Sequence, residues 1–155
     1  MFYFLHKNID FAHKIDNPSS PTEDYFKHIH GFNEILYFVR GQVKYTVESE
    51  TLELREGDLV FIPSGKYHFA TVDLSVPYER YVFKFSDSLV PEYMREKLAN
   101  NGSFYSNCKK YEVIFNQFDN YFKQYSDNEL YTLFMCETIK LLVSLMHNPL
   151  HPAKT

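Results

Sequence analysis

The stretch His28-Ile29-His30-Gly31-Phe32-Asn33-Glu34 decides the fold, together with a second stretch about thirty residues further along the chain. The second stretch reads Gly57-Asp58-Leu59-Val60-Phe61-Ile62-Pro63-Ser64-Gly65-Lys66-Tyr67-His68. Gly41 follows Glu34 after six residues, so the spacings are His-x-His-x3-Glu-x6-Gly and Gly-x5-Pro-x-Gly-x2-His. Residues two apart on a β-strand project to the same side. Three imidazoles and one carboxylate converge if both stretches lie in one small β-barrel, and the sequence therefore predicts a pocket.

The chemistry of this pocket has two interpretations. Neutral imidazoles bind Zn, Ni, Fe or Mn, and one added carboxylate broadens the choice towards Fe and Mn. A divalent transition metal held by His28, His30, Glu34 and His68 would keep one or two open coordination positions, as a catalytic site needs. Without a metal, the same groups hydrogen-bond each other or contact an effector, and no cofactor is required. A carboxylate beside imidazoles favours protonated histidine, so such a cluster is stable near neutral pH.

The composition is that of one soluble globular domain, with 155 residues, of which 45% are apolar and 23% charged. A net charge of -4 without a long basic run argues against direct DNA binding. The two cysteines, Cys108 and Cys136, have no metal-type spacing and fit a reducing compartment. We find neither a signal peptide nor a membrane span, because Glu137 and Lys140 interrupt the apolar stretch 130–146. We therefore expect a cytoplasmic protein without membrane contact.

Residues 1–87 have the pattern of a β-domain. Residues 2–14 predict a hairpin or a bent strand, and 17–21 predict a loop. Short strand-like runs with turns every 8–12 residues are typical of a sandwich or barrel. The predicted strands are Tyr25–His30, Glu34–Val39, Gln42–Glu48, Thr51–Arg55, Asp58–Ile62, His68–Val72 and Tyr78–Phe85.

Residues 88–147 have a helical pattern. Apolar residues from Tyr111 to Tyr125 recur at helical spacing, and Asp127 or Asn128 is expected to cap the next helix. That next helix is apolar around most of its circumference and must be covered on two sides, either within the chain or by a partner subunit. The residues expected in a homodimer interface are Tyr131, Met135, Ile139, Leu142, Val143 and Met146. Residues 148–155, with two prolines, predict the start of a linker.

The two opening motifs resemble the conserved motifs of the cupin superfamily at every liganding position. The run from His28 to Gly41, the run from Leu54 to His68 and the segment Tyr78–Phe85 together resemble the N-terminal sensor domain of AraC-type transcription regulators. The resemblance implies a cupin-like jelly-roll barrel followed by an antiparallel helix pair. It also implies a small effector in the barrel, a dimer through the helices and DNA contact through a C-terminal helix-turn-helix domain that residues 1–155 do not contain.

Two functional hypotheses follow. The first is a non-enzymatic sensor of a bacterial transcription regulator, and the second is a small cupin metalloenzyme of the dioxygenase or isomerase type. In both, the pocket contains His28, His30, Glu34 and His68. Arg40 and Arg80 could clamp an anionic effector, but we expect solvated or structural ion pairs instead. The apolar residues expected to line the pocket are Phe26, Leu36, Phe38, Phe61, Tyr67, Tyr81 and Phe83.

Overall fold

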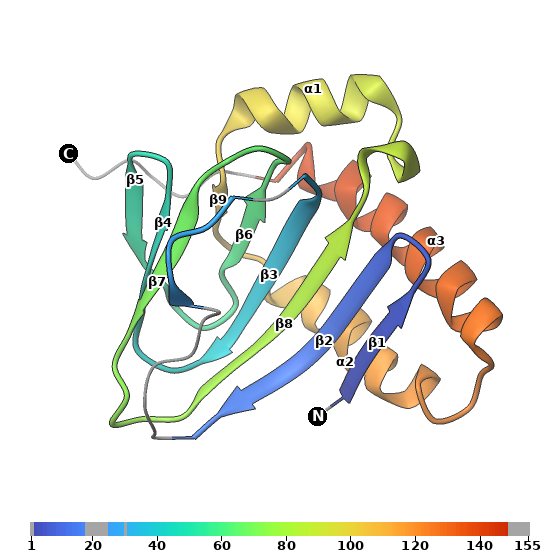
Figure 1. Ribbon diagram of the computed structural model, residues 1–155, viewed down its shortest axis with the longest axis horizontal. Coiled ribbons are helices and arrows are strands. Elements are labelled where there is room, and N and C mark those ends of the chain that lie inside the picture. The colour runs from blue at the N-terminus through green and yellow to red at the C-terminus, as the bar shows by residue number, and fades with distance from the viewer. Residues whose placement is uncertain (1, 18–24, 30, 149–155) are drawn as a thin grey trace.

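The computed structural model describes residues 2–17, 25–29 and 31–148, in which two antiparallel β-sheets face each other (Figure 1). The larger sheet has the strand order β1-β2-β8-β3-β6-β9, and the smaller one has the order β5-β4-β7. The strands are β1 (Phe2–His6), β2 (Ile9–Asp16), β3 (Asn33–Arg40), β4 (Val43–Val47), β5 (Glu50–Glu53), β6 (Leu59–Ile62), β7 (His68–Val72), β8 (Tyr78–Phe85) and β9 (Phe104–Tyr105). The mainly β class is confirmed, but within the described residues the sheets do not join into one closed barrel.

Most of the predicted strands are confirmed to within two residues at each end. The first strand-like region is a hairpin of β1 and β2 that turns at Lys7 and Asn8. The exception is the strand predicted at Tyr25–His30. Of its described residues, only His28 pairs with a strand, through reciprocal backbone hydrogen bonds of 3.1 Å with His68 of β7. This contact brings the two sequence motifs together.

The central strands β3, β6 and β8 of the larger sheet are buried on both faces, whereas Tyr3 and Leu5 of the edge strand β1 are exposed. The side-chain alternation of the central strands divides the core into two. Odd-numbered residues of β2, β3 and β8 pack against the helices, where Phe11 stacks on Phe134 with a centroid distance of 5.0 Å. Even-numbered residues of β3 and β8 point toward the smaller sheet, where Leu36 and Val82 share a second apolar cluster with Tyr45. Neighbouring residues of one strand therefore lie in two different environments, the core under the helices and the core between the two sheets.

The C-terminal helices cover the outer face of the larger sheet (Figure 1). They are α1 (Glu92–Asn101), α2 (Glu112–Tyr121) and α3 (Asp127–Leu145), with the short 3-10 helices η2 (Asp87–Leu89) and η3 (Lys109–Tyr111). The cap of α3 is Ser126 rather than Asp127 or Asn128. Its hydroxyl accepts from the backbone N–H of Glu129 at 3.3 Å, and the Glu129 carboxylate accepts from the backbone N–H of Ser126 at 3.0 Å. This reciprocal pair is a capping box.

The helical region differs from the expectation in two respects. It contains strand β9, which pairs with β6 and completes the edge of the larger sheet. It also buries part of the expected dimer face within the chain itself. Leu142 is fully buried in the core, and the hydroxyl of Tyr131 donates to Asn8 Oδ1 at 2.7 Å while Lys7 lies over its ring. Ile139, Met135 and Met146 stay partly exposed, and Val143 is 42% exposed.

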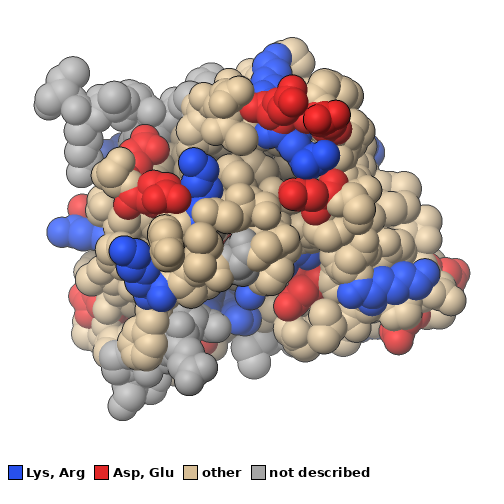
Figure 2. Space-filling model, turned by 45° about the horizontal axis from the view of Figure 1, so that its top comes forward, with Lys and Arg blue, Asp and Glu red and all other residues tan. Residues whose placement is uncertain are grey.

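None of the helices in the described part of the chain has the length and hydropathy needed to cross a bilayer. On the face drawn in Figure 2, acidic and basic side chains of the described residues are interspersed, and no broad basic patch gathers there. This distribution agrees with the low basic content of the sequence. The described residues on this face do not form the clustered positive charge that contact with a phosphate backbone requires.

Candidate functional site

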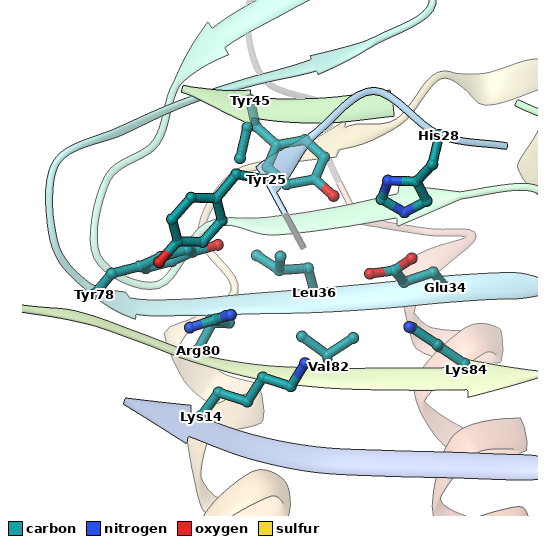
Figure 3. A pocket seen from close by; sticks show the side chains of 11 residues that line it. Lys14, Tyr25, His28, Glu34, Leu36, Tyr45, Tyr78, Arg80, Val82 and Lys84 are labelled. Atoms are coloured by element: carbon teal, nitrogen blue, oxygen red, sulfur yellow. The ribbon is translucent and has the colours of Figure 1, made fainter. Parts of the chain in front are cut away.

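A small cavity of about 40 Å³ lies between the two sheets. The larger sheet contributes residues of β2, β3 and β8, the smaller sheet contributes Tyr45 and Ala70, and the segment before β3 contributes Tyr25 and His28 (Figure 3). A space of this size holds an ion with its waters or a very small molecule. The described residues that line it are Lys14, Tyr25, His28, Glu34, Leu36, Tyr45, Ala70, Tyr78, Arg80, Val82 and Lys84.

One end of the cavity contains the histidines and the glutamate of the sequence motifs. Ligand atoms of His28, Glu34 and His68 all lie within 4.8 Å of one another. His68 Nε2 is 3.4 Å from Glu34 Oε2, and the rings of His28 and His68 meet edge to face with a centroid distance of 3.9 Å. His68 and Glu34 are buried, and His28 is half-buried. His30, the fourth member of the predicted set, lies outside the described residues.

Backbone carbonyls orient both imidazoles. His28 Nδ1 is 2.7 Å from the carbonyl oxygen of Phe26, and His68 Nδ1 is 3.1 Å from that of Lys66. A carbonyl oxygen only accepts, so each Nδ1 carries the hydrogen. The Nε2 of each ring then points away from that carbonyl. A histidine that ligates a metal has its other ring nitrogen fixed in this way, so the orientation suits a metal ligand.

The site fits a transition metal in part. Two ligands about 2.1 Å from one ion are separated by about 3 to 3.4 Å, which agrees with the distance from His68 Nε2 to Glu34 Oε2. Lys84 argues against an ion, because it sits directly opposite Glu34 in the β3–β8 register and its amine is directed toward that side of the cavity (Figure 3). A neighbouring ammonium competes with a divalent cation for the carboxylate. His28, Glu34 and His68 are the described residues that would hold an ion.

The other end of the cavity is formed around Arg80, which is 2% exposed. Its Nη1 lies 2.8 Å from Asp16 Oδ2, and its guanidinium lies 4.2 Å from the centre of the Tyr78 ring. The hydroxyl of Tyr25 donates to the same oxygen of Asp16. Burial raises the pKa of the Tyr78 hydroxyl well above its usual value although Arg80 acts to lower it, so this phenol stays neutral and able to donate.

The register of the strands sets the length of the cavity floor. Lys84 opposes Glu34, Val82 opposes Leu36 and Lys14 opposes Arg80. At about 3.3 Å per residue, the four steps from Arg80 to Lys84 along β8 span about 13 Å. The floor therefore has a cationic end at Lys14 and Arg80, an apolar middle and a second polar end at Glu34 and Lys84 (Figure 3).

The structure corrects most of the predicted pocket walls. Leu36 lines the cavity, and Phe38 lies in the same inner core without lining it. The side chain of Phe26 is 57% exposed and that of Tyr67 is 46% exposed. Three further residues were assigned to the wrong face of their strands, because they pack against the helices. These are Phe61, Tyr81 and Phe83.

The error in β8 has a physical origin. Its odd positions contain Tyr81 and Phe83, which resemble a pocket wall, and its even positions include Arg80 and Lys84, which resemble a solvent-exposed face. The face of β8 that carries the charged side chains is the one that lines the cavity. Sequence reasoning assigned Arg80 mainly to an ion pair, and the structure contains that ion pair. The cavity residues that it missed are Lys14, Tyr25, Tyr45, Ala70, Tyr78, Val82 and Lys84. The available signal was the alternation itself, since a sheet covered by helices and by a second sheet has no solvent face.

Residues 18–142 match the family described as AraC-like ligand binding domain. The chain belongs to this family. The match covers the motif segments, strands β3 to β8 and most of α3, so the resemblance noted in the sequence is confirmed over most of the chain. No curated protein matches the chain.

Solved structures similar to this chain include two that are described as cupins. The cupin domain of Cnp3 from Schizosaccharomyces pombe is 11% identical, with a TM-score of 0.48 over 57% of this chain and 64% of that one. An RmlC-like cupin family protein from Methanocaldococcus jannaschii is 19% identical, with a TM-score of 0.44 over 61% and 78%.

Salicylate 1,2-dioxygenase from Pseudaminobacter salicylatoxidans is 20% identical, with a TM-score of 0.42 over 50% of this chain and 22% of that one. The chain thus spans less than two thirds of the length of the dioxygenase and of the Cnp3 domain. These likenesses concern the fold alone.

Proposed function

We propose that this chain is the effector-sensing domain of a transcription regulator, and that the effector binds in the cavity between the two sheets. The observation that carries the proposal is the cavity itself, in which ionisable side chains and three tyrosines converge beside the apolar residues Leu36, Ala70 and Val82. Membership of the AraC-like ligand binding family supports it. DNA recognition is assigned to a helix-turn-helix domain outside residues 1–155, because the chain has a net charge of -4.

A sensing role requires the effector to bind one conformation better than another. The strands of the larger sheet suit this role because their alternate residues face the cavity and the helices. Arg80 lines the cavity, whereas the next residue, Tyr81, places its hydroxyl 2.9 Å from Asp119 Oδ2 on α2. A ligand that displaces Arg80 therefore shifts a residue in direct contact with a helix. A cavity of about 40 Å³ must also widen for all but the smallest effectors.

The proposal is tested by a small-molecule screen with thermal unfolding as the measurement. Ala70 faces the cavity and Thr71, the next residue in β7, is exposed, so Ala70→Leu fills the cavity and Thr71→Leu is the matched control. We expect at least one compound to raise the Tm of the wild type and of Thr71→Leu but not of Ala70→Leu. If every stabilising compound acts equally on all three proteins, the cavity is not the sensing site.

We also propose that a second copy of the chain docks on α3. Leu142 is buried and Tyr131 already contacts the β1–β2 turn, so neither is available to a partner. The rest of the predicted interface is a partly exposed apolar stripe of Met135, Ile139, Val143 and Met146. Their spacing places them along one side of the helix. Val143→Glu is expected to convert a dimer into a monomer in analytical ultracentrifugation, whereas Val113→Glu, at an exposed position of α2, is expected to leave the dimer intact. A monomeric wild type contradicts this part of the proposal.

The geometry of His28, Glu34 and His68 favours a metal-dependent cupin enzyme as the second candidate. A bound divalent metal would supply Lewis-acid or redox chemistry there, and the two imidazoles and the carboxylate would hold it. Elemental analysis of the purified protein, with His68→Gln as control, separates the candidates. Less than about a tenth of an equivalent of transition metal after gentle purification contradicts the enzyme, because such a ligand set retains its ion.

A further inference from the structure

A second pocket opens outside the cavity, beside the turn between β1 and β2. Its volume is about 280 Å³, compared with about 40 Å³ for the cavity between the sheets. A cavity of about 150 Å³ holds a molecule of benzene, so this pocket has room for a substituted aromatic ring or for two fused rings. Lys84 lines both spaces, and the other residues of the second pocket lie in the β1–β2 hairpin, in the segment before β3 and around the end of β8.

The strand register places this pocket on the inner face of the larger sheet, toward its β1 edge. Leu5 opposes Asp10, Asp10 opposes Lys84, and Lys84 opposes Glu34. Opposed residues of neighbouring strands share a face, so Leu5 and Asp10 lie on the face that also bounds the cavity. Leu5 is 62% exposed, whereas Glu34 is buried. The inner face is therefore open to solvent at its β1 edge, and a ligand can enter there without displacing the smaller sheet.

Apolar and charged side chains share the walls of this pocket. Leu5 and Phe32 supply apolar side chains, whereas Ile9 and Phe85, which also line it, belong to the core under the helices. The amine of Lys84 lies 5.5 Å from the centre of the Phe32 ring, which is the geometry of a cation–π contact. The aromatic ring of a ligand can be attracted to the same ammonium in the same way. The walls therefore favour an aromatic ligand over a saturated one of the same size.

The charges around Lys84 disfavour an ionic ligand of either sign. Asp10 on β2 and Glu34 on β3 both oppose Lys84 in the register. A ligand anion beside Lys84 is repelled by these carboxylates, and a ligand cation is repelled by Lys84 itself. Asp10 Oδ2 accepts a hydrogen bond from the hydroxyl of Tyr3 at 3.3 Å, and an ionised carboxylate can accept more than one. A neutral ligand with an O–H or N–H group can therefore donate to Asp10 as well.

Asn8 fixes the turn that forms one end of the pocket. Its Oδ1 accepts from the hydroxyl of Tyr131 on α3 at 2.7 Å, and its Nδ2 donates to Ser86 Oγ at 3.1 Å. The turn thus lies against α3 (Figure 1). A wall that is already held by hydrogen bonds costs little further ordering when a ligand binds. Because Asn8 also contacts α3, a ligand at this wall is expected to perturb that helix.

We propose that this pocket binds a neutral aromatic molecule of the phenol or indole type. Its ring lies against Phe32 and Lys84, and its O–H or N–H group donates to Asp10. The site is distinct from the effector site proposed in the cavity, and it does not depend on the sensing function.

The test compares aromatic molecules with matched molecules that lack one feature. Indole and phenol are titrated into the full chain, and binding is followed by the chemical shifts of backbone amides in NMR spectra. Cyclohexanol has the hydroxyl of phenol without the aromatic ring, and sodium benzoate has the ring with a negative charge. We expect phenol and indole to shift the amides of Leu5, Asp10 and Phe32. Phenol is expected to bind about two- to fivefold more tightly than cyclohexanol, the ratio that an exposed cation–π contact gives.

Each comparison can overturn the proposal. Cyclohexanol that binds as tightly as phenol would show that the ring is not recognised. Benzoate that binds more tightly than phenol would show that the site selects an anion.

Gly31→Leu is designed to block the pocket. A Cβ at Gly31 would meet no described atom within 4 Å beyond its chain neighbours, so the new side chain fits without a clash. Thr71→Leu, at an exposed position of β7, is the matched control. We expect Gly31→Leu to abolish the indole-induced shifts at Leu5 and Asp10, and Thr71→Leu to retain them. Indole binding of unchanged affinity in Gly31→Leu contradicts the proposed site.

Asp10→Ala tests the position of the donor. The loss of one acceptor is expected to weaken phenol binding about two- to tenfold, whereas Glu50→Ala, at an exposed position of β5, is expected to leave it unchanged. The Tm of each variant is measured alongside, so that a loss of folding is recognised. Phenol that binds a folded Asp10→Ala variant as tightly as the wild type overturns the role of Asp10.

The cavity-filling variant separates this inference from the proposed function. Ala70 lines the cavity and is not among the residues that line the second pocket, so Ala70→Leu is expected to leave indole binding unchanged. If Ala70→Leu abolishes indole binding and Gly31→Leu does not, the aromatic ligand binds in the cavity, so this inference falls and the sensing function stands. If none of the aromatic molecules binds while Ala70→Leu blocks a compound found in the screen, this inference alone is overturned.

Discussion

The imidazole of His13 lies flat on the ring of Tyr81, with a centroid distance of 4.1 Å and an interplanar angle of 15°. His13 Nε2 is 2.8 Å from Glu79 Oε2 on β8, and its Nδ1 is 3.1 Å from Asp119 Oδ1 on α2. His13 thus connects the sheet to the helix through two charge-assisted contacts, on the opposite side of β2 from the cavity.

Replacement of His13 by glutamine is expected to destabilise the protein. The ring is buried, and its loss removes both contacts with carboxylates that are themselves partly buried. An expected loss of about 1 to 3 kcal/mol in the free energy of unfolding follows. Urea denaturation measures it, with the exposed His147→Gln as control. A His13→Gln variant within about 0.5 kcal/mol of the wild type would show that the connection contributes little.

The pH dependence of stability is expected to reflect Glu79. Burial alone raises the pKa of Glu79, but hydrogen bonds from His13 and Arg40 outweigh it and hold the pKa below the ordinary value of 4.5. The unfolded chain therefore takes up this proton more readily than the folded chain. The stability from ionised Glu79 is complete above about pH 4.5 and is lost as the pH falls through the folded-state pKa.

Denaturation curves recorded between about pH 6 and pH 3, in steps of about half a pH unit, measure this effect. The stability of the wild type is expected to fall more steeply at the acidic end than that of Glu79→Gln, which has no carboxyl group at this position to protonate. Parallel curves for the two proteins would assign the acid sensitivity to other carboxylates.

The stability of the core between the larger sheet and the helices is expected to depend on the packing of Phe134. This residue of α3 is fully buried, stacks on Phe11 and meets Phe118 edge to face with a centroid distance of 4.7 Å. Phe134→Ala should cost about 3 to 5 kcal/mol, because it leaves a cavity among rings that cannot collapse. The control is Tyr93→Ala on α1, where the side chain is 63% exposed. Equal effects of the two changes in chemical denaturation would contradict the packing.

The two cysteines are expected to differ in reactivity. Cys108 is fully buried, and burial raises the pKa of its thiol to about 12 although Lys110 acts to lower it. The thiolate is the reactive form, so Cys108 should resist alkylation in the native protein. Cys136 is exposed on α3. A chromogenic thiol reagent should therefore detect one fast thiol in the native chain, two after denaturation and none in native Cys136→Ser. Two fast thiols in the native wild type would be inconsistent with the burial of Cys108.

The positions of the strands were predictable because turn residues lie at their ends and because side chains alternate between two faces along each strand. The face of each strand was not predictable, because in a sheet covered on both sides neither set of alternate residues meets solvent. In β8 the aromatic residues Tyr81 and Phe83 were predicted to line the pocket, whereas Arg80 was expected in a solvated or structural ion pair and Lys84 was not assigned. The motif residues were more reliable. His28, Glu34 and His68 meet as their spacing predicts, since one bridge between His28 and His68 aligns the two segments.

Strand β9 has a consequence for the cohesion of the whole chain. Its residues Phe104 and Tyr105 pair with Val60 and Leu59 of β6, and the carbonyl of Ser103 accepts from the backbone N–H of Phe61 at 2.8 Å. The helical region therefore covers the β6 side of the sheet with a strand of its own. A chain shortened after Phe85 would expose the apolar rim of β6, an arrangement through which β-proteins aggregate. The cavity-bearing half thus depends on its C-terminal neighbour for solubility as well as for packing.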